Sequence, residues 1–215
     1  MSHTLDIKTA GKPVGQAEKA LIMIHGRGGS AQDILSLSEH LNVEAYALLA
    51  PQATNGSWYP LSFLAPLEQN EPWLSSAIET VGATVKTALD AGIKTEHIYF
   101  FGFSQGACLS LEFLARNAQK YGGAMAIIGG VIGDKINRDN YIGDFAQTPV
   151  LLATSNPDFH VPVERVYATA NILKEMNADV TEKVYANFGH SINEEEIELA
   201  NSIVFKSLIA ATSNL

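Results

Sequence analysis

The feature that most constrains this chain is a serine held between two glycines, in residues 102–106, Gly-Phe-Ser-Gln-Gly. An apolar run typical of a strand precedes these residues, and a run typical of a helix follows them. A serine at such a junction sits on a tight turn, where side chains at the glycine positions would collide with the neighbouring strand and helix. The five residues alone could be a chance turn. The strand before and the helix after favour a functional interpretation, in which Ser104 is an exposed nucleophile.

Apolar runs alternate with helical patterns along the rest of the chain, which predicts an α/β fold with a mainly parallel sheet and helices on both faces. The runs at 20–24, 45–49, 98–103, 124–128, 150–153 and 180–186 are typical of strands. The last run also carries Thr181, Glu182 and Lys183, so we expect it near the edge of the sheet. Helices are expected near 31–41, 73–91, 105–120, 162–177 and 192–212.

Three of the expected helices have recognisable end signals. Ser191 and Glu194 have the spacing of a capping box at the start of the last helix. Pro162 suits a first helical position, and Gly92 suits the residue that ends a helix. These signals predict where the helices begin and end.

Length and charge limit the classes of protein to which the chain can belong. Its 215 residues suit one domain over residues 1–215, and a net charge of −9 without a basic stripe argues against nucleic acid or an anionic membrane surface as a partner. No apolar run approaches the roughly 20 residues of a membrane span, so we expect no stable membrane insertion. The oligomeric state stays open, a homodimer included.

The N-terminus and the cysteine content point to one compartment. The first eight residues lack the basic start and apolar core of a signal peptide. Cys108 is the only cysteine and cannot form an internal disulfide, which fits a reducing cytoplasm. We expect a cytoplasmic protein in which Cys108 is a small buried hydrophobic residue.

An irregular segment at 51–72 holds half of the eight prolines together with Trp58. A stretch of this length without regular structure is usually functional or disordered, and its aromatic residues make it too apolar for disorder. It either packs over the core or forms a wall or lid of a substrate pocket. On the second interpretation Trp58, Tyr59 and Phe63 contact the substrate.

A serine hydroxyl needs a base to take its proton, and His190 is the best candidate. It follows the last expected strand and precedes the last expected helix, in the kind of loop where open parallel sheets place their sites. His160 is a competitor for the role of base. In hydrolases with a serine on such a turn, however, an acidic residue lies between the serine and the histidine in the chain, and His160 lies in the region expected for that acid. Four other histidines remain. We expect His25 to shape a loop, His97 to start a strand, and His3 and His40 to lie at the surface.

The acid should lie between the serine and the histidine in the chain, and Asp158 follows the strand expected at 150–153. Asp158 would hold the His190 ring in the correct tautomer and stabilise its cation. Asp134, Asp139 and Asp144 lie in a polar loop and are expected to be solvated.

A glycine-rich loop at 25–30, His-Gly-Arg-Gly-Gly-Ser, follows the first expected strand. Glycines let a backbone approach a carbonyl group closely, so we expect the amides of Arg27 and Gln105 to form an oxyanion hole. The loop has neither the lysine of a P-loop nor the spacing of a dinucleotide fingerprint. The Arg27 side chain could meet an acidic group of the substrate or pair with Asp33, and we favour the pair with Asp33.

Together these motifs resemble the phospholipase/carboxylesterase family of the α/β-hydrolase fold, which includes small bacterial carboxylesterases and acyl-protein thioesterases. The resemblance runs from about Leu21 to the C-terminus, and Gly-Phe-Ser-Gln-Gly-Ala at 102–107 is its most specific part. It implies a triad of Ser104, Asp158 and His190 and an oxyanion hole at Arg27 and Gln105, with no large cap domain. The chain departs from thioesterase members, which usually have a leucine in place of Arg27.

The sequence thus predicts a serine carboxylesterase that hydrolyses small to medium acyl esters through an acyl-enzyme and needs no cofactor or metal. The alternative is an acyl thioesterase or lysophospholipase with a longer acyl pocket. A non-catalytic hydrolase fold that binds a ligand is a third interpretation, against which the complete Ser-Asp-His set argues.

Overall fold

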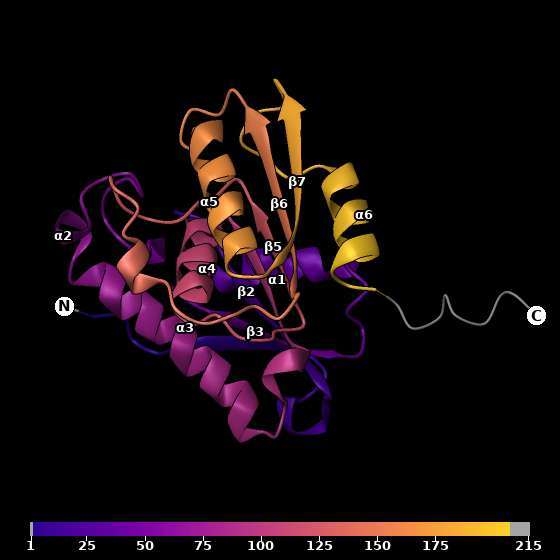
Figure 1. Cartoon of the computed structure of the whole chain (residues 1–215). Helices are drawn as coiled ribbons and strands as arrows, with labels where there is room; N and C mark the ends of the chain where they lie inside the picture. The colour runs from indigo at the N-terminus through magenta and orange to yellow at the C-terminus, as the bar shows by residue number, and fades with distance from the viewer. Residues whose placement is uncertain (1, 207–215) are drawn as a thin grey trace, which may run out of the picture.

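Figure 1 presents the fold as a computed structural model, which describes residues 2–206. Within this part of the chain the strands form one sheet in the order β1-β3-β2-β4-β5-β6-β7. Only β1 is antiparallel to its neighbour, and all other pairs are parallel. The strands are β1 (Ile7–Gly11), β2 (Lys19–Ile24), β3 (Tyr46–Pro51), β4 (Ile98–Phe103), β5 (Gly123–Ile127), β6 (Pro149–Asn156) and β7 (Asp179–Ala186).

Helices cover the sheet on both faces. In Figure 1, α3, α4 and α5 lie along one face, and α1 and α6 lie along the other. The α-helices are α1 (Ala31–Ser36), α2 (Leu67–Asn70), α3 (Trp73–Asp90), α4 (Gln105–Arg116), α5 (Val163–Glu175) and α6 (Glu194–Ile203). Short 3₁₀ turns are η1 (Val14–Gln16), η2 (Leu37–His40), η3 (Thr54–Gly56), η4 (Thr95–His97) and η5 (Arg138–Asn140). This arrangement confirms the α/β-hydrolase fold that the sequence predicts.

The six expected strands are confirmed, and β7 lies at the edge as predicted. The structure adds β1, which the apolar pattern does not reveal because four of its five residues are exposed. β1 is the opposite edge strand and pairs with β3 alone. Because neither of its faces is buried, its sequence lacks the apolar pattern of a strand. β6 also extends three residues beyond the expected end, to Asn156.

The helix boundaries differ from the prediction at several ends. The predicted capping box at Ser191 and Glu194 is wrong, because Asn193 and Glu196 exchange the reciprocal hydrogen bonds at the start of α6. Pro162 is the N-cap of α5, one position before the predicted one. Gly92 follows α3 with a φ of +89°, as its predicted place at a helix end requires.

Two predicted helices are also shorter than expected. α4 ends at Arg116, before the expected end at 120, and α6 ends at Ile203. Residues 207–212 of the last expected helix lie outside the described residues.

The strand order places one crevice at the centre of the sheet. The chain leaves β2 toward β3 on one side, whereas β4 begins the run toward β7 on the other. At such a switch point the loops after two neighbouring strands separate and leave space at their carboxyl ends. The loop after β2 carries Arg27 and the turn after β4 carries Ser104, so these two residues meet at the crevice.

Candidate active site

Ser104 stands on a strained turn between β4 and α4, with φ of 53° and ψ of −118°. A positive φ in a residue with a side chain costs on the order of 1–3 kcal/mol and persists only where the surroundings enforce it. Here the Ser104 amide donates to Ile127 O at 2.9 Å, and Ser104 O accepts from the Cys108 amide at 3.0 Å. β5 and the first turn of α4 therefore hold the residue in this conformation.

The two flanking glycines are required because backbone atoms crowd them. A Cβ on Gly106 would lie 2.1 Å from Ile24 O, and a Cβ on Gly102 would lie 2.6 Å from Gly106 O. Both distances are below any real contact of a Cβ atom, so any side chain at either position would push β2, β4 and α4 apart. The collision expected from the sequence is confirmed.

His190 bridges Ser104 and Asp158. Its Nε2 lies 2.8 Å from the Ser104 Oγ, and its Nδ1 lies 2.8 Å from Asp158 Oδ2. A carboxylate can only accept, so Nδ1 carries the proton and Nε2 accepts from the serine hydroxyl. The loops after β4, β6 and β7 thus bring together three side chains that are far apart in the sequence.

Asp158 is fixed by its own loop. Its side chain is fully buried, and its Oδ1 accepts from the amides of His160 at 2.8 Å and Val161 at 2.9 Å. Burial alone would raise the pKa of the Asp158 carboxyl, but these hydrogen bonds and the one from His190 outweigh it and hold the pKa below its ordinary value. Asp158 is therefore an anion that faces the imidazole. Asp134, Asp139 and Asp144 are exposed, as expected.

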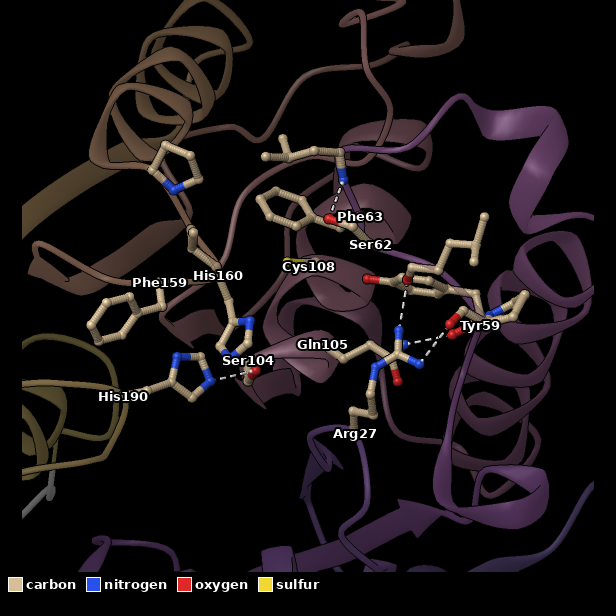
Figure 2. Close-up of a pocket in the computed structure, with 15 residues that line it drawn as sticks. Arg27, Tyr59, Ser62, Phe63, Ser104, Gln105, Cys108, Phe159, His160 and His190 are labelled. Carbon is tan, nitrogen blue, oxygen red and sulfur yellow. Dashed lines mark hydrogen bonds between the residues drawn. The ribbon is translucent and has the colours of Figure 1, made fainter.

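His160 lies beside His190. Its ring centroid is 5.0 Å from that of His190, edge to face, and its side chain is exposed. Figure 2 shows both rings near Ser104, with the dashed bond running from His190. The hydrogen bond with Ser104 favours His190 as its partner.

The glycine-rich loop lies directly against the serine. A Cβ on Gly26, the residue before Arg27, would be 3.4 Å from Ser104 Cβ. Among residues 2–206, neither the Arg27 amide nor the Gln105 amide donates a hydrogen bond to the protein. Backbone amides that are free to donate suit the oxygen of an attacked carbonyl, so the expected oxyanion hole stays a prediction.

The Gln105 side chain has a role that the sequence does not reveal. Its Oε1 accepts from the Trp58 amide at 2.9 Å, and its Nε2 donates to Tyr59 O at 2.9 Å. Gln105 therefore ties the segment at 51–72 to the first turn of α4. The sequence shows only that a glutamine follows Ser104, and this residue type alone does not indicate the link.

The Arg27 side chain does not pair with Asp33, which corrects that expectation. Its Nη1 donates to Ser57 Oγ at 3.0 Å and Pro60 O at 2.9 Å, and its Nη2 donates to Leu61 O at 2.6 Å. Asp33 instead caps α1, since its Oδ2 accepts from the amide of Ser30 at 2.8 Å.

A pocket of about 750 Å³ opens above Ser104. Its volume lies within the range of small-molecule sites. Figure 2 shows the lining residues, with Tyr59 and Phe63 from one wall and His160 from another. The pocket is lined by Arg27, Tyr59, Pro60, Leu61, Ser62, Phe63, Leu64, Ser104, Gln105, Cys108, Phe159, His160, Val161, Pro162 and His190.

The segment at 51–72 both packs on the core and forms a pocket wall. Trp58 does not line the pocket, which corrects its expected contact with substrate. Its side chain is completely buried, and its Nε1 donates to His25 O at 2.9 Å. Trp58 supports the wall from behind, whereas Tyr59 and Phe63 face the pocket.

Two histidines stabilise the same region. His25 shapes its loop as predicted, because its Nδ1 donates to Gly26 O at 2.8 Å and its Nε2 accepts from the Ala53 amide at 3.1 Å. His3 is buried, so its predicted surface location is wrong. Its ring packs edge to face on Trp58 and Trp73, and burial lowers its pKa.

Cys108, also part of the lining, is buried as expected, and burial raises the pKa of its thiol to about 12. The thiol is therefore protonated and a poor nucleophile. In the described part of the chain no group of three or more His, Cys, Asp or Glu side chains is placed to hold a metal ion. Nor does any described helix have the length and apolar character to cross a membrane.

Comparison with known proteins identifies clear relatives. The model of the phospholipase/carboxylesterase family matches residues 6–208. The crystal structure of a phospholipase/carboxylesterase from Dyadobacter fermentans has 52% sequence identity and a TM-score of 0.95, covering 96% of this chain and 99% of that one. Acyl-protein thioesterase 1 of Aspergillus fumigatus is 30% identical over an alignment of 206 positions that covers 83% of each chain.

A plant relative is matched over a smaller share of its length. The Arabidopsis thaliana protein named probable carboxylesterase SOBER1-like is 26% identical over 161 residues, which are 74% of this chain and 62% of that protein. The match therefore spans less than two thirds of the plant protein.

Proposed function

This chain belongs to the phospholipase/carboxylesterase family of α/β-hydrolases, a family of enzymes that act on esters, and from that premise we propose that it is a serine carboxylesterase. The observation that carries the proposal is the position of the His190 ring, 2.8 Å from both the Ser104 hydroxyl and the Asp158 carboxylate. In the proposed roles Ser104 is the nucleophile, His190 the general base and Asp158 the residue that orients it.

The first half of the reaction forms an acyl-enzyme. His190 Nε2 takes the proton of Ser104 as the Oγ attacks the ester carbonyl carbon. The carbonyl oxygen becomes an oxyanion, which the amides of Arg27 and Gln105 stabilise. The positive charge that develops on His190 is balanced by Asp158, whose lowered pKa keeps it ionised. His190 then protonates the departing alcohol and the bond between carbonyl carbon and alcohol oxygen breaks.

The second half restores the enzyme with water. His190 takes a proton from a water molecule, whose oxygen attacks the same carbonyl carbon. The bond to Ser104 Oγ breaks, the proton returns to Ser104 and the carboxylic acid leaves. The protein residues supply every proton transfer and all the charge stabilisation, so the proposed mechanism requires no metal or organic cofactor.

Small to medium acyl groups fit the proposal best. The wall beside Ser104 carries apolar groups on Leu61, Phe63 and Leu64, which favour an acyl chain. The Arg27 guanidinium lines the same space. An apolar chain packed against it would remove that charge from water, which costs desolvation free energy. This cost grows with the length of the buried chain.

An acyl thioesterase or lysophospholipase is the second candidate, favoured by the 30% identity to the acyl-protein thioesterase of Aspergillus fumigatus. The same three residues could cleave a thioester, and the pocket would then have to accept a long acyl chain. Matched oxygen esters and thioesters of acetyl, butyryl, octanoyl and palmitoyl groups separate the two candidates. A carboxylesterase gives its highest kcat/KM on oxygen esters of the short members.

Ser104→Ala is the direct test of the chemistry. Losing the nucleophile of such a unit typically lowers the rate by several orders of magnitude. The variant should keep the far-ultraviolet circular dichroism spectrum of the unaltered protein, because alanine fits the same turn. A folded variant that retained a tenth of the turnover on nitrophenyl acetate would exclude Ser104 as the nucleophile.

A further inference from the structure

The Arg27 guanidinium is a cation without an acidic partner in the described chain. No ion pair among residues 2–206 includes it. Its hydrogen bonds to Ser57, Pro60 and Leu61 use three of the five N–H groups of a guanidinium. At least two N–H groups are therefore left for another acceptor. The side chain is exposed and lines the pocket, so that acceptor can come from a ligand.

The pocket carries no negative side chain that would repel an anion. The ionisable residues that line it are Arg27, Tyr59, Cys108, His160 and His190. No aspartate or glutamate lines the pocket. This absence contrasts with the net charge of −9 for the whole chain. Asp158 lies behind His190 with its side chain fully buried. Among the residues that line the pocket, Arg27 thus supplies the one permanent charge, and this charge attracts an anion at short range.

Three acceptors hold the guanidinium in place, which makes it a positioned group and not a mobile surface charge. The Pro60 and Leu61 carbonyls belong to the pocket wall, and Gln105 ties that wall to α4. A cation whose orientation is already fixed loses little conformational entropy when it binds a carboxylate. The same three acceptors are neutral, so they leave the positive charge uncompensated.

The position of Arg27 indicates which part of an ester would carry the anion. His190 protonates the leaving alcohol in the proposed function, so the alcohol must leave on the side of His190. In Figure 2, Arg27 and Tyr59 lie on the opposite side of Ser104 from His190. The acyl group, which stays bound to Ser104, extends toward that side.

We infer that the preferred substrate has an acyl group that ends in a carboxylate, and that the Arg27 guanidinium binds this carboxylate. The substrate class is the half-esters of short dicarboxylic acids, and hydrolysis releases the dicarboxylic acid and the alcohol. This inference rests on the proposed function and adds a specificity-determining residue to it. A guanidinium and a carboxylate form hydrogen bonds in a charge-assisted pair, which discriminates against a neutral group of the same shape.

The test compares two ethyl esters of equal size. One is monoethyl glutarate, and the other is its amide counterpart, in which a carboxamide replaces the distal carboxylate. The unaltered protein should have a kcat/KM about tenfold higher for the acid, the size expected of a charge-assisted pair at a partly exposed site. Glutarate stands in a series from malonate to adipate, and the preference should peak at one length.

Variants assign the preference to Arg27. Arg27→Gln should reduce the ratio of acid to amide to about one, and Arg27→Lys should restore part of it by returning the charge. Both variants loosen the wall at Pro60 and Leu61, and this lowers the rates on acid and amide together without changing their ratio. Arg138→Gln is the matched control, because Arg138 is an exposed cation outside the pocket lining and its loss changes the net charge equally. It should leave the ratio unchanged.

The outcomes separate the inference from the proposed function. If the unaltered protein hydrolyses the ethyl ester that carries the carboxamide, and Ser104→Ala does not, the proposed function is supported. A ratio of one between the kcat/KM values for the acid and the carboxamide in the unaltered protein would then overturn the inference alone. Equal changes of the ratio in Arg27→Gln and Arg138→Gln would also overturn it, because they indicate only net charge. Acetyl glycolate is an ester that carries its carboxylate in the leaving alcohol. If the protein preferred this compound and not the half-esters, the anion would bind on the side of His190, and the inference would be overturned.

Discussion

The side-chain amide of Gln105 donates a 2.9 Å hydrogen bond to the backbone carbonyl of Tyr59. This bond joins the residue after the proposed nucleophile to the wall of the pocket. Gln105 therefore combines two functions in one position, since its backbone amide is a proposed oxyanion donor and its side chain fixes the wall. The chemistry and the substrate wall cannot move independently while this link is intact.

Gln105→Ala should therefore weaken the wall while keeping the backbone amide. It removes two buried hydrogen bonds, at a cost of about 2 kcal/mol in the free energy of unfolding. The Trp58 amide is left without a partner, whereas the Tyr59 carbonyl keeps its bond from the Ser57 hydroxyl. Urea denaturation measures this loss, and KM should rise more than kcat falls. A variant with unchanged KM but strongly reduced kcat would show that the side chain serves the chemistry directly.

Asp158→Asn should impair turnover much more than His160→Ala. Asparagine can still bond to His190, but it favours the wrong tautomer and cannot balance the imidazolium; the equivalent change in serine proteases costs about four orders of magnitude. His160 makes only a ring contact with His190, at 5.0 Å between centroids. Steady-state kcat/KM on nitrophenyl butyrate compares the two variants. If His160→Ala were as damaging as His190→Ala, the base would have to be reassigned.

Glu196 provides a test of stability against pH. It is buried at the start of α6, and burial raises the pKa of its carboxyl from 4.5 to about 7. An acid with a raised pKa in the folded state binds protons more tightly there than in the unfolded chain. Folding is therefore destabilised as the pH rises from about 4.5 to 7, and the full penalty applies above about pH 7.

Glu196→Gln should remove this penalty and keep the cap, because glutamine can accept from the Asn193 amide as Glu196 does. The variant should be more stable than the unaltered protein at about pH 8, by on the order of 2 kcal/mol, and nearly equal to it at about pH 5. Urea denaturation at both values measures the difference. Glu198→Gln, an exposed change on the same helix, should show no such dependence on pH. The same pH dependence in both variants would contradict the assignment to burial.

Three residues of the candidate site were predictable because each one follows a strand. Ser104, Asp158 and His190 come directly after β4, β6 and β7, and parallel strands bring their carboxyl ends to one edge of the sheet. Their order in the chain, serine then acid then histidine, restricted the candidates further. Local pattern and chain order together indicated these three residues, which the structure joins by hydrogen bonds through His190 and whose catalytic roles are proposals.

The supporting contacts were not predictable because they join side chains to distant backbone atoms. Arg27 bonds to the carbonyls of Pro60 and Leu61, which any residue at those positions would present. The sequence therefore favoured Asp33, a visible opposite charge. His3 was expected at the surface because its partner is also a backbone group that the sequence does not reveal. Its Nε2 lies 2.9 Å from the Trp58 carbonyl oxygen. Such contacts carry no pattern of residue types.

The distinction between Trp58 and Phe63 gives the last prediction. Both were expected to contact substrate, but only Phe63 lines the pocket, and Trp58 is buried behind the wall. Phe63→Ala should enlarge the pocket and shift the profile of kcat/KM over acetyl, butyryl, octanoyl and palmitoyl esters toward the longer chains. Trp58→Ala should mainly lower the free energy of unfolding, by about 3–5 kcal/mol, because it leaves a cavity and breaks the bond to His25.

Phe113→Ala is the matched control for Phe63→Ala, because both phenylalanines are 6% exposed and Phe113 lies outside the pocket lining. Each variant loses one buried phenyl ring and a similar amount of the free energy of unfolding. A shift in the chain-length profile that appears only in Phe63→Ala must therefore come from the shape of the pocket. The profiles should be compared at a temperature at which circular dichroism shows each variant to be folded. An identical shift in both variants would mean that chain-length preference follows stability, and the acyl wall would then have to be sought outside the segment at 51–72.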